Sequence, residues 1–200
     1  MGGMLDIVGS AIIFGVLLLT VARVQENLNT TMYQNTYNLI TQTTAINIAR
    51  QMEYDFTKIG YRVTGQRISR ADTTAIAFNG AMTYGGVVDS IAYTLGDDDD
   101  TSTNPRDHVL NRYSRLSGIT IPQRIGLSVF YLTYFDTTNV EITQPITTVA
   151  QLNAIRSINV RMRFESRDPL PQVGADTSVY FAVNWEKLIY ARNLGGLNLR

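Results

Sequence analysis

The sequence contains no cysteine, so disulfide bonds, thiolate metal sites and cysteine nucleophiles are all excluded, while the redox compartment stays open. It contains one histidine, His108, which nearly excludes a zinc site. It also lacks the GxSxG elbow, the Walker loop and the GxGxxG motif. We therefore predict that the protein is not an enzyme and has no cofactor.

Charge is scarce as well. Charged residues make up 17% of the 200 residues, below the roughly 25% of ordinary soluble domains. The 17 basic and 17 acidic residues cancel to a formal net charge of +0. No block of Lys and Arg offers a footprint for a phosphate backbone, so we predict no nucleic-acid partner. The balance is typical of a sparsely charged, extracytoplasmic surface.

One stretch near the N-terminus has no charge at all. The chain is apolar over residues 7–22, and Arg23 is the first basic residue. A helix of this run is about 24 Å long, and a few apolar flanking residues bring it near the roughly 20 residues that span a bilayer. We predict that residues 1–23 form a hydrophobic half-helix that suits a membrane.

Two other interpretations of this run stay open. It could be a secretory signal, cleaved at the small residues Thr20, Val21 and Ala22, or an ordinary uncleaved anchor. The lack of any Lys or Arg before the run argues against the signal. A secreted domain would then begin at Arg23.

Helical periodicity continues beyond Arg23, and no proline interrupts it. Gly60 is a natural C-terminal stop and Lys58 complements the helix dipole, so we predict an amphipathic half of the same helix over residues 24–60, ending near residue 59. The whole helix would be about 80 Å long. Its apolar residues recur mostly three and four positions apart, and we expect them, aromatic residues included, to pack in the core: Val24, Leu28, Met32, Tyr33, Tyr37, Ile40, Ala45, Ile48, Met52, Phe56 and Ile59.

Residues 61–200 change to short β-branched and aromatic runs between turn residues, which predicts a β-rich head with an antiparallel sheet. Packing the helix on this sheet gives an α+β fold in which residues 24–200 form one unit. Alternation is clearest over residues 157–165, with Ile158 and Val160 on the inner face. The expected strands are Thr74–Phe78, Ser90–Leu95, Leu127–Phe135, Ser157–Glu165 and Tyr180–Trp185.

Three other segments are less regular. Thr148–Ile155 has the spacing of a short helix or turn, and Trp185–Asn193 is either a strand that ends in a loop or a short helix. Gly96–Asp107 is polar and rich in turn residues, so we expect a loop that faces solvent. Oxygen-rich Ca²⁺ coordination is conceivable there, but the EF-hand spacing is missing and a solvated loop is the better interpretation. The acids concerned are Asp97, Asp98, Asp99 and Asp100.

Other charged residues suggest no chemistry. Glu53 and Asp55 point to different helix faces and do not form an acid/base couple, so we interpret them as solvated or inter-subunit charges. His108 has Ser114 nearby in sequence, but no catalytic motif accompanies the pair.

Four segments, in this order, resemble the type IV minor pilins and type II secretion pseudopilins of the PilW/GspJ class. Residues 49–61 are similar to the family's helix end, of the form leucine-x-x-aspartate-leucine-arginine-x-alanine-glycine-tyrosine. Residues 131–136 resemble its tyrosine-tyrosine-aspartate strand end, and residues 155–162 its late edge strand. Residues 191–194 are similar to its terminal arginine-asparagine-leucine. With the hydrophobic helix, the likeness spans nearly the whole chain and implies a pilin-like fold.

The resemblance also implies how the chain assembles. The hydrophobic helix would be stored in a membrane and then buried in the filament core, and an acid at the fifth mature position would pair with a neighbour's N-terminal amine. Asp6 is the only acid available, where the family has Glu, and it is fifth if the mature chain begins at Gly2. The alternative for Asp6 is a flank at the lipid headgroups. The residues implied in processing are Gly2, Gly3 and Met4, and those implied in assembly are Asp6, Ile7, Ile12, Phe14, Leu18 and Val21.

From this resemblance we expect a structural filament subunit that assembles with copies of itself or with other pilin-like subunits. It would span the cytoplasmic membrane once, with an extracytoplasmic head, and become part of a periplasmic or extracellular filament. The alternative is a membrane-anchored binding module that does not polymerise.

Overall fold

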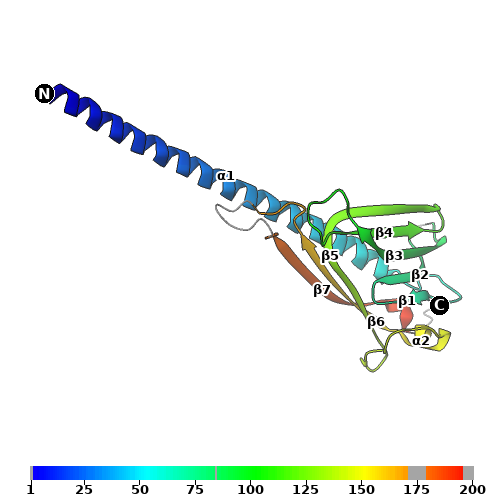
Figure 1. The fold of residues 1–200 in the computed structure, drawn as a ribbon. Helices are drawn as coiled ribbons and strands as arrows, with labels where there is room; N and C mark the ends of the chain where they lie inside the picture. Colours follow the sequence, from blue (N-terminus) through cyan, green and yellow to red (C-terminus); the bar gives the residue numbers. More distant parts are fainter. Residues whose placement is uncertain (1, 84, 171–178, 196–200) are drawn as a thin grey trace.

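The computed structural model describes residues 2–83, 85–170 and 179–195 and has an α+β architecture (Figure 1). One long N-terminal helix, which we call the stem, leads into a seven-stranded antiparallel sheet that forms most of the head. The elements in chain order are α1 (Gly2–Thr57), β1 (Ile68–Ala71), β2 (Ala75–Ala81), β3 (Val88–Asp98), β4 (His108–Ser114), β5 (Ile119–Phe135), α2 (Val149–Ala154), β6 (Ser157–Glu165), β7 (Ala182–Tyr190) and the 3₁₀ turn η1 (Arg192–Leu194).

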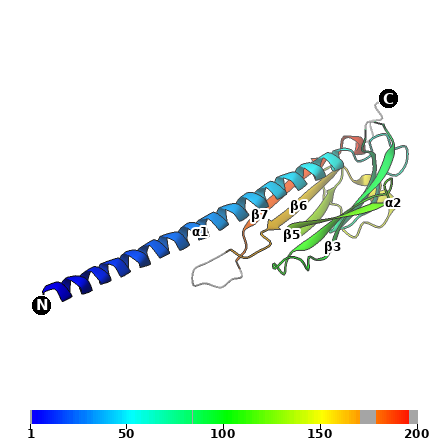
Figure 2. The ribbon, with the colours of Figure 1, turned by 90° about the horizontal axis from the view of Figure 1, so that it is seen from above.

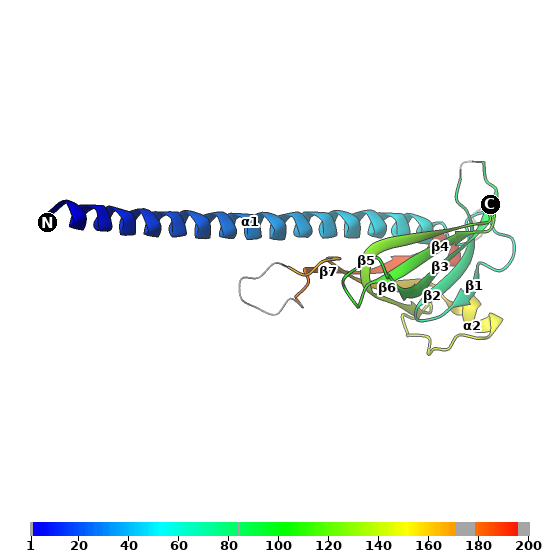
Figure 3. The same ribbon diagram turned by 45° about the horizontal axis from the view of Figure 1, so that its top comes forward.

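The stem is one continuous helix of 56 residues, about 84 Å long at 1.5 Å per residue. Its N-terminal part projects away from the head, and its C-terminal part lies along the sheet (Figure 3). It ends at Thr57, two residues before the predicted end. Gly60 follows in the left-handed conformation, with φ of 75°, and its N–H donates to the Asn79 carbonyl at 2.8 Å.

The strands follow one another in the order β1-β2-β3-β4-β5-β6-β7, each antiparallel to its neighbours. The long strand β5 pairs with β4 up to Leu127 and with β6 from Leu127 onward. Just before this change Gly126 has φ of 71°, and a Cβ there would lie 2.2 Å from the Glu165 carbonyl oxygen. Only glycine fits this close approach. The sheet therefore curls about β5.

The core forms where the last turns of the stem meet the curled sheet (Figure 2). The Phe56 ring is edge-on to Phe78 at 5.5 Å and to Tyr93 at 5.9 Å between centroids. Met52 is also fully buried, as are the inward residues of β6, and each such side chain contributes roughly 1.5–3 kcal/mol. The expected inner face of β6 is thus confirmed: Ile158, Val160, Met162 and Phe164.

The predicted sheet is confirmed in type, and β6 has its predicted bounds. Strand β2 extends beyond the prediction at its C-terminal end and β3 at both ends, while β7 begins and ends later than predicted, at Ala182 and Tyr190. Strands β1 and β4, and the first half of β5, were not predicted. That half contains Pro122, which is tolerated because only β4 pairs with it there.

Both undecided segments are now assigned. Residues 149–154 form the short helix α2, which begins with a capping box between Thr148 and Gln151. The segment from Trp185 to Asn193 is the end of strand β7 followed by the turn η1, so the strand alternative is right.

Candidate functional site: the uncovered stem

The N-terminal part of the stem touches nothing else in the described chain (Figure 1). Gly2, Gly3 and Met4 lie in its first turn. A Cβ added at Gly9 or Gly15 would meet only open space. The side chains predicted to serve assembly are all exposed: Asp6, Ile7, Ile12, Phe14, Leu18 and Val21.

By length and composition the stem qualifies as a single membrane span or a signal anchor, and none of its most apolar window is buried. The hydroxyls in this part donate to carbonyls of the preceding turn, Ser10 to Ile7 at 2.9 Å and Thr20 to Val16 at 2.8 Å. Their hydrogen bonds are therefore satisfied within the helix, which suits an environment without water.

The apolar surface continues beyond the hydrophobic half-helix. We call residues 2–40 the uncovered stem and residues 41–57 the docked stem. Leu28, Met32 and Leu39 are 65%, 67% and 68% exposed, whereas Met52 and Phe56 of the docked stem are fully buried. The expected core stripe is therefore wrong over its first half. Val24, Leu28, Met32 and Tyr33 are exposed, whereas Tyr37 and Ile40 reach only a cavity at the edge of the head and do not join the core.

Helix geometry explains why this stripe is broken. At about 100° per residue, Tyr33 lies roughly 140° around the axis from Phe56, so the two rings cannot face one sheet. The side of the stem that faces the head carries polar residues before the docked stem begins, such as Gln34 and Asn38. The apolar residues are spaced three and four positions apart, but their direction around the helix axis changes along the stem, so they do not share one face.

A buried polar network joins the docked stem to the head. Asp55 is 3% exposed and accepts hydrogen bonds from the Tyr93 hydroxyl at 2.7 Å and the Arg112 Nε at 2.8 Å. Burial, together with the Asp55 carboxylate, raises the pKa of Tyr93 far above its usual range. Glu53 pairs with Lys187 of β7 at 2.6 Å. The interpretation as a solvated or inter-subunit charge is therefore wrong for Asp55, which is buried and bound within the chain. Glu53 stays 43% exposed and is solvated, although it pairs with Lys187.

The loop between β3 and β4 also differs from its predicted solvated form. Asp99 and Asp107 are buried, and Asp99 pairs with Arg124 and Arg167. Burial alone would raise the pKa of Asp99, but hydrogen bonds from Thr101 and Arg124 outweigh it and hold the pKa low. Burial raises the pKa of Asp107, whose carboxylate has no hydrogen-bond partner among the described residues.

The four aspartates considered for Ca²⁺ do not converge. Asp97 and Asp98 are exposed at the end of β3, Asp99 points inward to arginines, and Asp100 is exposed in the turn. Across residues 2–83, 85–170 and 179–195, no three His, Asp or Glu side chains form a group that could hold a metal ion.

His108 and the nearby serine are likewise apart. His108 Nδ1 lies 2.9 Å from Asp98, whereas the Ser114 hydroxyl donates to Asp89 at 2.6 Å. The two side chains therefore belong to separate contacts and form no serine–histidine couple.

No family model, curated protein or solved structure matches this chain. The functional argument therefore rests on the geometry of the chain itself.

Sequence reasoning missed the contacts that cross the fold. Strand β4 was not predicted, so Arg112 could not be placed opposite Asp55. A buried acid on a helix whose neighbours Met52 and Phe56 face the core was the available signal, since such an acid needs a partner.

Proposed function

We propose that the chain is a structural subunit of a type IV pilin-like or type II secretion pseudopilus-like filament, which polymerises through its stem. The head would decorate the filament surface. The resemblance of residues 49–61 to the pilin helix end is one support. The uncovered stem is the other, and it carries the argument.

The apolar surface of the stem is longer than a bilayer can cover. Residues 4–24 account for a hydrocarbon thickness of about 30 Å. Beyond them, about 25 Å of helix runs to the docked stem and exposes Leu28, Met32 and Ile40. Large apolar side chains exposed in this way among polar residues suit an interaction surface. Neighbouring stems in a filament would cover it, whereas a lone anchored head would leave it in water.

Asp6 fits the same proposal. It is the only carboxylate before Arg23, and it lies on a helix surface that would be enclosed by apolar neighbours. An unpaired buried carboxylate is costly, so pairing with the N-terminal amine of an adjacent copy would set the axial register of the subunits.

Before assembly the stem would cross the cytoplasmic membrane once, and the head would lie outside the cytoplasm. Partners would be copies of this chain or other pilin-like subunits. Glycine near the start of the helix, at Gly2 and Gly3, would allow the close approach that processing requires.

Substituting Asp6 tests this function. We expect Asp6→Ala to abolish filaments that are sheared from cells and seen by electron microscopy, while the amount of chain in the membrane stays the same. Asp6→Glu is the matched control and should retain filaments, because it keeps the charge. Normal filaments from Asp6→Ala would remove the proposed role of this carboxylate.

The mass of the N-terminal peptide from native cells separates the alternatives. A start at Gly2 or Met4, particularly with an added N-methyl group, is expected for a processed filament subunit. A start at Arg23 would instead identify a secreted domain, and an unprocessed chain would favour the anchored binding module.

A further inference from the structure

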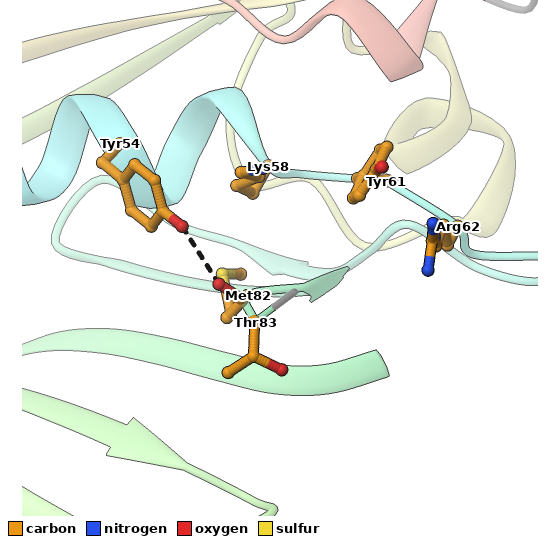
Figure 4. Close-up of a pocket in the computed structure, with 6 residues that line it drawn as sticks. All are labelled: Tyr54, Lys58, Tyr61, Arg62, Met82 and Thr83. Atoms are coloured by element: carbon orange, nitrogen blue, oxygen red, sulfur yellow. Dashed lines mark hydrogen bonds between the residues drawn. The ribbon is translucent and has the colours of Figure 1, made fainter. Parts of the chain in front are cut away.

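A cavity of about 190 Å³ opens at the end of the stem, where the helix passes into the head (Figure 4). Its walls come from the last turn of α1, the segment after it and the connection between β2 and β3. The lining residues are Tyr54, Lys58, Tyr61, Arg62, Met82 and Thr83. We call this cavity the stem-end pocket.

Two cations are held in place beside the tyrosine rings of the pocket. Lys58 Nζ lies 5.6 Å from the ring centroid of Tyr54 and 4.8 Å from that of Tyr61. The Arg62 guanidinium lies 5.4 Å from the Tyr61 ring. The Tyr54 hydroxyl donates to the Met82 carbonyl at 3.0 Å, which ties the stem to the β2–β3 connection. The rings therefore position the charges.

Backbone conformation and packing also fix the position of Arg62. Arg62 has φ of 59°, a left-handed conformation that costs a non-glycine residue free energy. A Cβ on Gly86 would lie 2.0 Å from Arg62 Nη1, so the guanidinium packs directly on the bare glycine backbone. Arg62 is exposed, but its contacts with Gly86 and Tyr61 set the position of its guanidinium.

Neither cation is neutralised within the described residues. No carboxylate there lies within ion-pair distance of Lys58 or Arg62. The nearest acids along the helix are already engaged, Glu53 with Lys187 and Asp55 with Arg112. The pocket therefore presents two positive charges that have no partner in this part of the chain.

The complementary charge lies at the other end of strand β3. We call Asp97, Asp98 and Asp100 the acidic run; all three are exposed, and only Asp98 has an ion-pair contact among the described residues, with His108. Strand β3 begins at Val88, just after the pocket, and its 11 residues extend about 36 Å. One copy cannot bring the two ends together.

We infer that the stem-end pocket binds the acidic run of a second copy of this chain. The formal net charge is +0, so the attraction would be local, between Lys58 and Arg62 of one copy and the acidic run of the next. A contact between two different surfaces of identical copies is head-to-tail and can repeat without closing, which suits a filament. This inference rests on the proposed function, to which it adds a specific contact between heads.

The chain has no cysteine, so a disulfide between two copies can form only between cysteines that are introduced by substitution. Such a disulfide therefore reports this contact. We expect full-length chain carrying both Thr83→Cys and Asp100→Cys, oxidised in filaments on cells, to give a ladder of linked multimers. Chains with either cysteine alone should give at most a dimer. The control pair, Thr83→Cys with Thr137→Cys, places the second thiol on another exposed loop and should give no ladder.

Charge reversal tests the electrostatic basis. In the two-cysteine chain, Arg62→Glu should lower the multimer yield about tenfold, because it places like charges together. Adding Asp97→Lys and Asp98→Lys to that variant should restore the yield. Arg161→Glu, at an exposed arginine of β6 that does not line the pocket, is the matched control and should leave the yield unchanged.

The outcomes separate this inference from the proposed function. Filaments that form without the ladder would overturn the contact and leave the filament function standing. A disulfide to a different protein would show that the occupant is not a second copy, and would also overturn it. If Arg62→Glu does not fold, the ladder of the two-cysteine chain still decides, since it leaves Lys58 and Arg62 intact. Absence of filaments from the unmodified chain would instead remove the proposed function.

Discussion

The docked stem and the uncovered stem belong to one unbroken helix but have opposite surroundings. In residues 41–57 the apolar side chains meet the sheet, and Met52 and Phe56 lose all contact with water. In residues 2–36 equally apolar side chains are exposed, and only the last turn before the docked stem, with Tyr37 and Ile40, reaches the edge of the head. Both parts are therefore helical, but only the docked stem is buried against the head. The comparison indicates that the docked stem stabilises the head, whereas the uncovered stem contributes little packing within the chain.

Phe56→Ala should cause the largest loss of unfolding free energy among the substitutions in the docked stem. The ring packs against Phe78 of β2 and Tyr93 of β3, so its removal leaves a cavity and should destabilise the head by about 3–5 kcal/mol. Denaturant unfolding of the full chain in detergent measures this change. A loss below about 1 kcal/mol would show that the stem contributes little to the core.

The next largest effect is expected from Asp55→Ala. The change leaves Arg112 without its carboxylate partner and the buried Tyr93 hydroxyl without its acceptor, and should cost about 3 kcal/mol of unfolding free energy. The matched control is Lys187→Ala, which breaks the exposed pair with Glu53 and should cost less than about 1 kcal/mol. Equal costs in the same unfolding assay would contradict the special role of the buried network.

Gly60→Ala tests how the docked stem ends. The left-handed backbone there strains any residue with a Cβ, and the added atom would also press on Arg67 at 3.0 Å. We expect a loss of about 1–2 kcal/mol. Gly65→Ala is the control, since a Cβ there meets nothing within 4 Å. Similar melting temperatures for the two variants would argue against this strain.

The smallest effect on unfolding should come from the uncovered stem. Leu28→Ala should change the unfolding free energy of the head by no more than about 0.5 kcal/mol, because Leu28 has no contact to lose in its own chain. Its effect should appear in assembly instead, as fewer sheared filaments at equal membrane level. A charged residue, as in Leu28→Asp, should enlarge that loss. Unchanged filaments from Leu28→Asp would contradict the role of this surface.

The sequence predicts those parts of the fold in which the local pattern and the tertiary environment agree. Strand β6 alternates over its whole length because one face is buried, and Gly60 ends the helix because only glycine suits that conformation. Strand β4 has a single fully buried residue, Leu110, so its pattern was too weak to identify.

The rest depends on contacts that no local pattern contains. Spacing could not show that the sheet ends before Ile40, so half of the expected core stripe is uncovered. Nor could it show that Asp99 meets Arg124, far along the chain, or that the β2–β3 connection lies against the end of the stem. The acid proposed for assembly, Asp6, was accessible to sequence reasoning because it interrupts an apolar run.

The absence of any break in the stem also has a mechanical consequence. A pull on one end of a helix without proline or bulge is passed along its whole length, and the load enters the head through the side chains of Met52, Asp55 and Phe56. These side chains lie on neighbouring turns and contact the head at the same time. Their contacts would therefore have to break together under the pull. Tension on such a filament would therefore enter the head at the docked stem and at the edge strand β7, which lies against the stem and holds the Glu53–Lys187 pair.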